Sequence, residues 1–273
     1  MKKKVFLMSP AMFILFAFAI VPLFIMLYYS FLSDGAVAKF TLDNYKNFFS
    51  KGFYLKLTWK TIKMSIIVTI VCVFIAYPMA YIMAKVINKG KNILLLLIII
   101  PFWTSQLVRA YSWLVFLRDG GVLAQILNTL GLISTTDMGI LFTSKAAIIA
   151  LVHIFFPYMV ITIYMSLEKL DNSIIDASKS LGAKPIETFR RIILPLSRHG
   201  IITGSILVFV PCLGSFVEPR ILGGVNGSVI GTVIEDQFFE IYGWNFGAAI
   251  AFILLAMVLL SMGGMSILLN KEK

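Results

Sequence analysis

Three polar or aromatic residues are spaced along an apolar part of the sequence so that a helix would bring them to one side. Gln106, Arg109 and Trp113 occupy positions i, i+3 and i+7 of that segment. If the segment spans a membrane, the arginine costs at least about 2.5–3.5 kcal/mol on insertion scales and must face protein or a watery path. Arg109 could therefore pair with an acidic residue or a helix C-terminus, or it could take part in a gate.

Other residues could handle a cation, because aromatic faces and carboxylates both attract positive charge. The candidates near the ends of apolar segments are Trp103, Tyr111, Trp113, Trp244, Glu218, Glu235, Asp236 and Glu240. An interfacial aromatic belt with solvated loop carboxylates would give the same pattern. No Asp or Glu lies deep in an apolar segment, which favours a transient, low-affinity path over a tight site. We expect that path near Trp103, Gln106, Arg109, Tyr111, Trp113, Glu218 and Asp236.

The sequence contains none of the common catalytic or nucleotide-binding motifs. There is no His-Glu-x-x-His, no Gly-x-Ser-x-Gly and no Gly-x4-Gly-Lys-Ser/Thr loop to hold ATP phosphates. Cys72 and Cys212 lie inside apolar runs and are expected to fill the core rather than form a disulfide or bind zinc. We therefore expect a non-catalytic chain without a metal site or bound cofactor, with any ATP and Mg²⁺ used by a partner subunit.

These residues must be positioned by membrane-spanning elements, because the chain is too apolar for a soluble protein. Of its 273 residues, 59% are hydrophobic and 14% charged, against about 45–50% and about 25% in soluble domains. A spanning helix needs roughly 20 apolar residues, whereas a spanning β-strand needs about 9–11 of alternating polarity. Six suitable segments occur, charge-free apart from Arg109: 5–33, 64–84, 92–117, 146–167, 200–217 and 241–270. The sequence predicts an all-α polytopic membrane protein in which residues 1–273 form one domain.

Four other features of the spans and loops lead to expectations. The apolar run from Val5 to Leu32 exceeds the 7–15 residues of a signal-peptide core, so we expect an uncleaved span. The aromatic and basic loop 34–63 suits either an interfacial helix or a solvated connector. Gly200 and Gly204 would let helices pack closely, unless their spacing is chance. His153 is expected to be a hydrogen-bonded interior side chain, with a proton relay as the alternative.

The distribution of basic residues predicts the orientation of the chain. The two tails and the loops 85–91 and 168–199 carry 14 Lys and Arg, whereas the opposite loops carry nine. Because Lys and Arg gather on the cytoplasmic side, both termini are expected there. The net charge of +11 is spread between spans, which excludes the concentrated basic surface of a nucleic-acid-binding protein.

The loop 171–195 between the fourth and fifth spans carries the most specific pattern. It is expected to form two short helices: Asn172 or Ser173 would cap the first, Gly182 would end it in a left-handed turn, and Pro185 would begin the second. Small or apolar residues at i, i+3, i+4 and i+7 share one face of the first helix, namely Ile174, Ala177, Ser178 and Leu181. This narrow face would project into the cytoplasm and suits a groove on a partner protein.

The spacing of this loop resembles the EAA loop of ABC-importer permeases, whose pattern is Glu-Ala-Ala-x3-Gly-x9-Ile-x-Leu-Pro. The matching residues are Asp176, Ala177, Ser178, Gly182, Ile192, Leu194 and Pro195, with Asp in place of Glu and Ser in place of the second Ala. The resemblance implies a type I ABC-importer permease fold with six transmembrane helices. It also implies that residues 174–181 form a coupling helix that docks into an ATPase subunit. A basic loop that only sets topology beside anionic lipid is the alternative.

Longer segments are similar to the PotB-type permeases of bacterial spermidine/putrescine importers. The similar segments are 101–113, 167–171, 216–224, 230–231 and 236–238. The resemblance implies a multi-pass subunit of the bacterial inner membrane that forms half of a polyamine path. It implies as partners a second, PotC-like permease, two PotA-like ATP-binding subunits and an extracytoplasmic, PotD-like polyamine-binding protein. Glu218 is a position where relatives are expected to vary, so a substrate role for it does not follow from the resemblance.

Two alternatives stay open. An ABC permease for an iron chelate or an anion would make an arginine in the path more natural. A self-contained secondary transporter would be expected to show intramembrane ionisable relays or inverted repeats, and the sequence shows neither.

Overall fold

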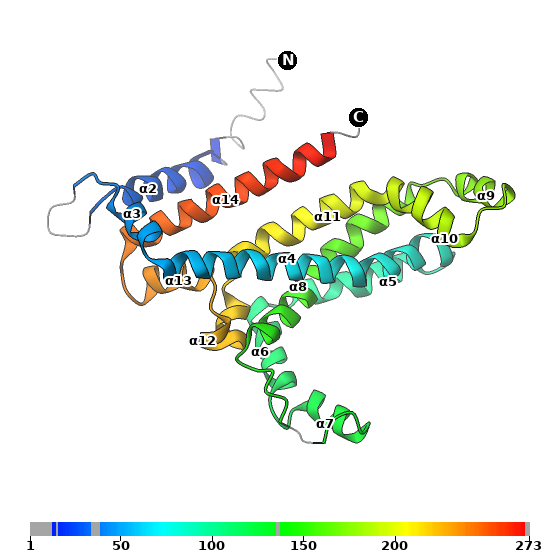
Figure 1. Ribbon diagram of the computed structural model, residues 1–273, viewed down its shortest axis with the longest axis horizontal. Coiled ribbons are helices and arrows are strands. Elements are labelled where there is room, and N and C mark those ends of the chain that lie inside the picture. Colours follow the sequence, from blue (N-terminus) through cyan, green and yellow to red (C-terminus); the bar gives the residue numbers. More distant parts are fainter. Residues whose placement is uncertain (1–12, 15, 34–38, 135–136, 271–273) are drawn as a thin grey trace, which may run out of the picture.

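The computed structural model describes residues 13–14, 16–33, 39–134 and 137–270, which form helices joined by short turns (Figure 1). The α-helices are α2 Val21–Ser30, α3 Asp43–Ser50, α4 Gly52–Tyr81, α5 Lys91–Ile99, α6 Gln106–Leu117, α7 Val122–Thr129, α8 Ser144–Glu168, α9 Asn172–Ser180, α10 Pro185–Thr188, α11 Leu194–Gly214, α12 Gly224–Gly227, α13 Ile230–Phe239 and α14 Trp244–Asn270. Tighter or wider helical turns are η1 Phe16–Ile20, η2 Ile82–Val86, η3 Ile100–Trp103, η4 Phe189–Ile193 and η5 Pro219–Gly223. Extended pairing among the described residues is limited to an isolated antiparallel bridge between Leu32 and Phe40. The prediction of an all-α fold is confirmed.

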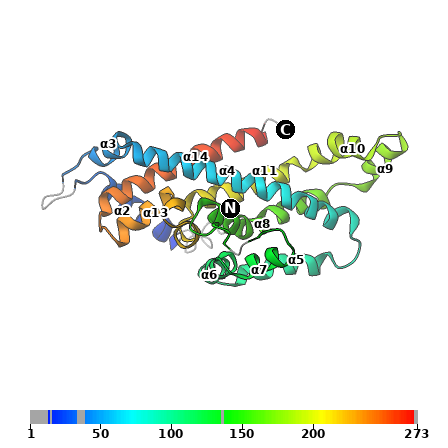
Figure 2. The ribbon, with the colours of Figure 1, turned by 60° about the horizontal axis from the view of Figure 1, so that its bottom comes forward.

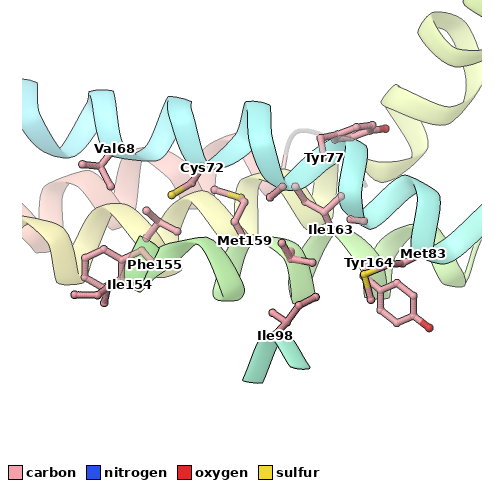
Figure 3. Packing of buried hydrophobic residues seen from close by; sticks show 14 of the residues in the cluster. Val68, Cys72, Tyr77, Met83, Ile98, Ile154, Phe155, Met159, Ile163 and Tyr164 are labelled. Carbon is pink, nitrogen blue, oxygen red and sulfur yellow. The ribbon is translucent and has the colours of Figure 1, made fainter. Parts of the chain in front are cut away.

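Three long helices, α4, α8 and α11, form the core. Figure 3 shows Val68 and Cys72 of α4 lying among apolar side chains of α8 that include Met159 and Ile163. Cys212 of α11 belongs to the same buried cluster. Both cysteines are free and buried, so the prediction that they fill the core is confirmed.

The contact between α8 and α11 depends on two glycines. A Cβ atom at Gly200 would lie 2.6 Å from both the Thr162 carbonyl oxygen and the Ser166 Cβ, and one at Gly204 would lie 2.4 Å from the Thr162 Oγ1. At Gly200 the backbone oxygen cannot turn away, so only glycine allows this helix spacing. At Gly204 the closest atoms are the ends of the Thr162 and Met159 side chains, which must shift if a methyl group is added. Gly200 and Gly204 therefore have a packing role, and their spacing is not a chance occurrence.

Four helical stretches in the described part of the chain are long and apolar enough to cross a membrane: Gly52–Val86, Ser144–Glu168, Pro185–Gly214 and Trp244–Gly264. A fifth is added if two helical stretches bent by 95°, Lys91–Trp103 and Gln106–Thr129, count as one span. The predicted first span, 5–33, lies partly outside the described residues, and its described apolar helix, Phe16–Ser30, is shorter than these. The chain thus has several apolar helices of spanning length.

The bounds of three predicted spans are corrected by the structure. The span predicted at 64–84 begins at Gly52, because charged residues at its start hid a continuous helix from a count of apolar residues. The span predicted at 200–217 extends back to Pro185, since the wide turn η4 carries the helix past Pro195, which has no backbone N–H. The predicted continuous helix 92–117 is broken, because Thr104 and Ser105 have extended backbone.

The two ends of the long axis carry different loops. The helices α9 and α10 lie at one end, and α2, α3 and α13 lie at the other (Figures 1 and 2). Helix α3 lies in the loop 34–63, and its Phe48 is buried with Tyr54, Ile230 and Phe246. This part of the loop is therefore a helix packed on the protein, which excludes a fully solvated connector.

We expect Gly200→Ala to destabilise the protein by about 1–3 kcal/mol, because the added methyl group would press on a backbone carbonyl of α8 that cannot turn away. The measurement is the thermal unfolding of the purified protein in detergent. Gly263→Ala is the matched control, since it adds the same methyl group to helix α14 where nothing lies within 4 Å. Equal stability of the two variants would show that the α8–α11 contact tolerates expansion.

Candidate functional site

The helix predicted to contact a partner, α9, projects at one end of the molecule together with α10 (Figure 1). Asp171 caps it by accepting a hydrogen bond from the Ser173 backbone amide at 2.9 Å. This bond holds the pKa of Asp171 below its usual value. The prediction that Asn172 or Ser173 would be the cap is therefore wrong by one or two positions, because the loop turns into the helix earlier.

The predicted turn geometry around α9 is confirmed. Gly182 has a φ of +82°, a left-handed conformation that favours glycine. Pro185 stands in the first turn of α10, where its missing N–H costs nothing. The second helix is not short, however, because α10, η4 and α11 run on as one stretch from Pro185 to Gly214.

The side chains of α9 divide between an outer and an inner face. Leu181 is 88% exposed and Ile174 is 44% exposed, and Ala177 and Asp176 are exposed beside them. Ser178 is buried and shares a 2.8 Å hydrogen bond with Thr188 of α10. The expectation that Ser178 belongs to the outer face is wrong, because its hydroxyl group has a partner inside the loop.

The rest of the loop motif leads into α11. Ile192 and Leu194 are half-buried and Pro195 is exposed. Phe189 places its ring edge-to-face with Tyr77 of α4, with the ring centroids 5.6 Å apart. The hydroxyl groups of Tyr77 and Ser197 lie 2.8 Å apart. These contacts join the loop to α4.

Two lysines that the sequence analysis did not single out anchor the start of the loop. The Lys85 Nζ donates to the Leu170 carbonyl oxygen at 2.5 Å and to the Asn172 Oδ1 at 2.9 Å. The Lys91 Nζ forms an ion pair with Glu168 at 3.0 Å. Sequence reasoning used these lysines only for orientation, because their partners are about 80 residues away and no local spacing reveals such a pair.

The second group of predicted residues lies at the break between η3 and α6. The Arg109 Nη1 donates to the Pro101 carbonyl oxygen at 2.7 Å, and its guanidinium carbon lies 6.0 Å from the centre of the Phe102 ring. Its Nε is buried and has no hydrogen-bond partner in the described structure. Arg109 thus ties α6 to the end of the preceding helix.

Glu218, which follows α11, is fully buried. Its Oε1 accepts a 2.9 Å hydrogen bond from the Gln106 Nε2, and its Oε2 has no partner among the described residues. Burial raises the pKa of Glu218, while the Gln106 hydrogen bond and the positive charge of Arg109 act in the opposite direction. The alternative of a solvated loop carboxylate is excluded for this residue.

Two pockets adjoin these groups. One, of about 310 Å³, is lined by Phe102, Gln106, Arg109, Ile154, Phe155, Tyr158, Pro211, Gly214, Ser215 and Phe216. The other, of about 360 Å³, is lined by Thr104, Val108, Arg109, Ser112, Trp113, Phe116 and His153. Arg109 therefore lines both pockets, and the first combines aromatic walls with the polar side chains of Gln106, Arg109 and Ser215.

The other candidates are distributed around this site. Trp103 is 89% exposed and Tyr111 and Trp244 are also exposed. The Trp113 Nε1 donates to the His153 Nδ1 at 3.3 Å, so this histidine is hydrogen-bonded as expected, but its side chain is exposed and the expected interior position is wrong. In the described part of the chain, no group of three or more His, Cys, Asp or Glu side chains could hold a metal ion.

Asp236 lies outside the two pockets and is paired with a cation of the protein itself. Arg220 binds the carboxylate of Asp236 and donates from its Nε to the Glu235 Oε2 at 3.0 Å. Glu240 lies 3.7 Å from the same guanidinium group. The cluster ties η5 to the end of α13, and one arginine faces three carboxylates there.

The chain matches the family described as "Binding-protein-dependent transport system inner membrane component" over residues 76–271. It is 41% identical to the spermidine/putrescine transport system permease protein PotB of Escherichia coli over 85% of each chain. It is 39% identical to the Haemophilus influenzae protein of the same name, over 86% of this chain and 82% of the relative.

Solved structures show the same fold at low identity. One is a bacterial ABC transporter involved in the import of the acidic polysaccharide alginate, with a TM-score of 0.70, 16% identity and 97% of this chain and 96% of that chain covered. Another is a bacterial alginate ABC transporter in complex with an alginate pentasaccharide-bound periplasmic protein, with a TM-score of 0.76, 16% identity and 94% and 93% coverage. The fold is that of an ABC-transporter permease. With its several apolar helices, this multi-pass chain belongs to the family of binding-protein-dependent transport system inner membrane components.

Proposed function

We propose that the chain is the PotB-like permease subunit of an ATP-driven importer and forms half of the path that carries polyamines across the bacterial inner membrane. The observation that carries this proposal is 41% identity to a spermidine/putrescine permease over 85% of both chains. A match over that share of the chain includes both the loops and the apolar spans. The aromatic walls of the pocket beside Gln106 support a cationic solute, because aromatic faces attract ammonium groups.

The proposed topology has six spans in one domain, residues 1–273, with both termini in the cytoplasm. In that orientation α9 lies at the cytoplasmic end and η5, α12 and α13 lie at the outer end. The helix Pro185–Gly214, which separates these two regions, is long enough to cross the membrane. The excess of basic residues on the loops 85–91 and 168–199 supports this orientation.

In the proposed mechanism α9 is the coupling helix, with Ile174, Ala177 and Leu181 as its docking face and Asp176 beside it. An exposed leucine at the tip of a loop is explained if a partner covers it, since large exposed apolar side chains cluster at interaction sites. Ser178 and Gly182 shape the helix, while Ile192, Leu194 and Pro195 join it to α11. Movement of a docked ATPase would then reach α4 through Phe189 and Tyr77.

The proposed partners are two PotA-like ATP-binding subunits, a PotC-like second permease and an extracytoplasmic, PotD-like polyamine-binding protein. ATP and Mg²⁺ would be bound by the ATPase subunits, because this sequence has no phosphate-binding loop. One solved relative of the same fold is a transporter in complex with a loaded periplasmic protein, which supports a binding-protein partner at the outer end.

For the substrate, we expect ATP-dependent accumulation of labelled spermidine or putrescine in proteoliposomes that contain the complete complex and its binding protein. The physical basis is the aromatic lining of the pocket, whose ring faces attract ammonium groups, beside the Glu218 carboxylate that Gln106 holds. Labelled molybdate and a ferric chelate serve as competitor solutes in parallel vesicles. Accumulation of either of these without polyamine uptake would contradict the proposed substrate.

For the orientation, we expect single cysteines at positions 180 and 226, in a chain whose Cys72 and Cys212 have been replaced, to differ in labelling by an impermeant thiol reagent on intact cells. Asn226 is exposed in α12 and should react, whereas Ser180 in α9 should react only after the membrane is opened. Labelling of position 180 from outside would reverse the topology.

For the coupling helix, we expect Ala177→Trp to prevent close docking and Gly182→Val to strain the turn by about 1–3 kcal/mol, because Gly182 has a positive φ. Both variants should insert in the membrane but lose their ATPase subunits on purification, or lose the stimulation of ATP hydrolysis by loaded binding protein. The measurements are co-purification and ATPase rate.

Lys179→Trp is the matched control for Ala177→Trp. Lys179 is exposed on the same helix, about 200° around the axis from Ala177, and should retain docking. Normal assembly and transport in the Ala177 and Gly182 variants would contradict a coupling role for residues 174–181.

A further inference from the structure

A fully buried carboxylate with one unused oxygen lies beside the aromatic pocket. The Glu218 side chain has no exposed surface, and its Oε2 has no hydrogen-bond partner within the described structure. A carboxylate oxygen that is buried without a hydrogen-bond donor costs free energy. A group that donates a hydrogen bond to this oxygen would therefore stabilise the site. No ion pair between Glu218 and Arg109 is formed within 4.0 Å among the described residues, and the Arg109 Nε is itself without a partner.

Gln106 links this carboxylate to the pocket. Its side chain is exposed, it lines the 310 Å³ pocket, and its Nε2 holds the Glu218 Oε1. Gln106 is the first residue of α6, directly after the break at Thr104 and Ser105. Gln106 is therefore the side chain that lies in contact with both the pocket and Glu218.

An alkylammonium group can replace what Gln106 supplies. The amide donates one hydrogen bond to Oε1, whereas an ammonium group donates up to three and brings a positive charge. It would satisfy both carboxylate oxygens, and its methylene chain would lie against Phe102, Phe155 and Tyr158, which line the pocket. Charge-assisted hydrogen bonds of this kind are about twice as strong as neutral ones.

We propose that Glu218 is an ammonium-binding subsite of the translocation path, covered by Gln106 in the structure described here and reached when that side chain turns away. The inference rests on the proposed polyamine transport and adds to it the group that receives one end of the solute. Arg109, which lines the same pocket, repels a cation and keeps the subsite weak. Weak binding is what a path requires, because the solute must also leave.

The test compares Glu218→Gln with wild type in proteoliposomes containing the complete complex, with labelled spermidine as the probe. We expect kcat/KM for uptake to fall by about 10- to 100-fold, the loss expected for a hydrogen-bonded charge pair. Stimulation of ATP hydrolysis by loaded binding protein should be unchanged, because the docking surfaces are intact. Asp43→Asn is the matched control, since Asp43 is an exposed carboxylate in the loop before α4.

Two further variants separate binding from a merely structural brace between α6 and η5. Gln106→Ala removes the cover and should lower the KM for uptake, whereas a brace would make it as harmful as Glu218→Gln. Glu218→Asp keeps the negative charge and should retain more uptake than Glu218→Gln. If the Glu218→Gln complex fails to assemble, uptake by Glu218→Asp and Gln106→Ala tests the proposal instead.

The outcomes distinguish failure of the ammonium subsite from failure of the proposed polyamine transport. Uptake by Glu218→Gln equal to that of Asp43→Asn, or equal losses in the Gln106 and Glu218 variants, would overturn the ammonium subsite and leave polyamine transport standing. Failure of the wild-type complex to accumulate spermidine would overturn the proposed function, and the subsite with it.

Discussion

The close approach of α11 to α8 at Gly200 and Gly204 is the contact on which the other features depend. A side chain at Gly200 would push the helices apart, because a Cβ there would overlap with the Thr162 carbonyl oxygen of α8. The loop 171–195 connects these same two helices, so their spacing sets where α9 can lie. Lys85 then fixes the start of α9 to η2, the turn that continues α4, the third helix of the core. The position of the exposed tip is thus a consequence of helix packing in the membrane.

Helix α11 also connects the tip with the buried carboxylate. It begins with Leu194 and Pro195 at the end of the loop motif and ends shortly before Glu218, and its 21 residues span roughly 30 Å at 1.5 Å per residue. Gly200 and Gly204, where the helix lies close to α8, are toward its middle, so a tilt about that contact would displace both of its ends. The Gln106–Glu218 hydrogen bond lies at the end farther from α9. Movement at α9 therefore has a short structural route to the group that holds Glu218 covered.

Sequence patterns predicted the features that depend on local chemistry. The lengths of the apolar segments predicted the long helices. Gly182 and Pro185 also have the conformations predicted for them, because a positive φ and a missing N–H act locally. The break of the third span escaped prediction, since Thr104 and Ser105 are ordinary residues in a helix. Arg109 bridges the break with a hydrogen bond to the Pro101 carbonyl, eight residues earlier, and no i, i+3 or i+4 spacing reveals this contact. The same holds for Lys85 and Ser178, whose partners are set by the fold.

The least predictable group is Glu218, whose sequence neighbours suggested a solvated loop. Its burial arises because η5 folds back against α6 and α8, which no local spacing reveals. The result is one acid and one base near a shared pocket without a direct pair, each with an unused polar atom. A strong pair would neutralise both groups and close the site. Two incompletely satisfied charges instead leave a position that a cationic group can occupy and leave again, which is the property a translocation path needs.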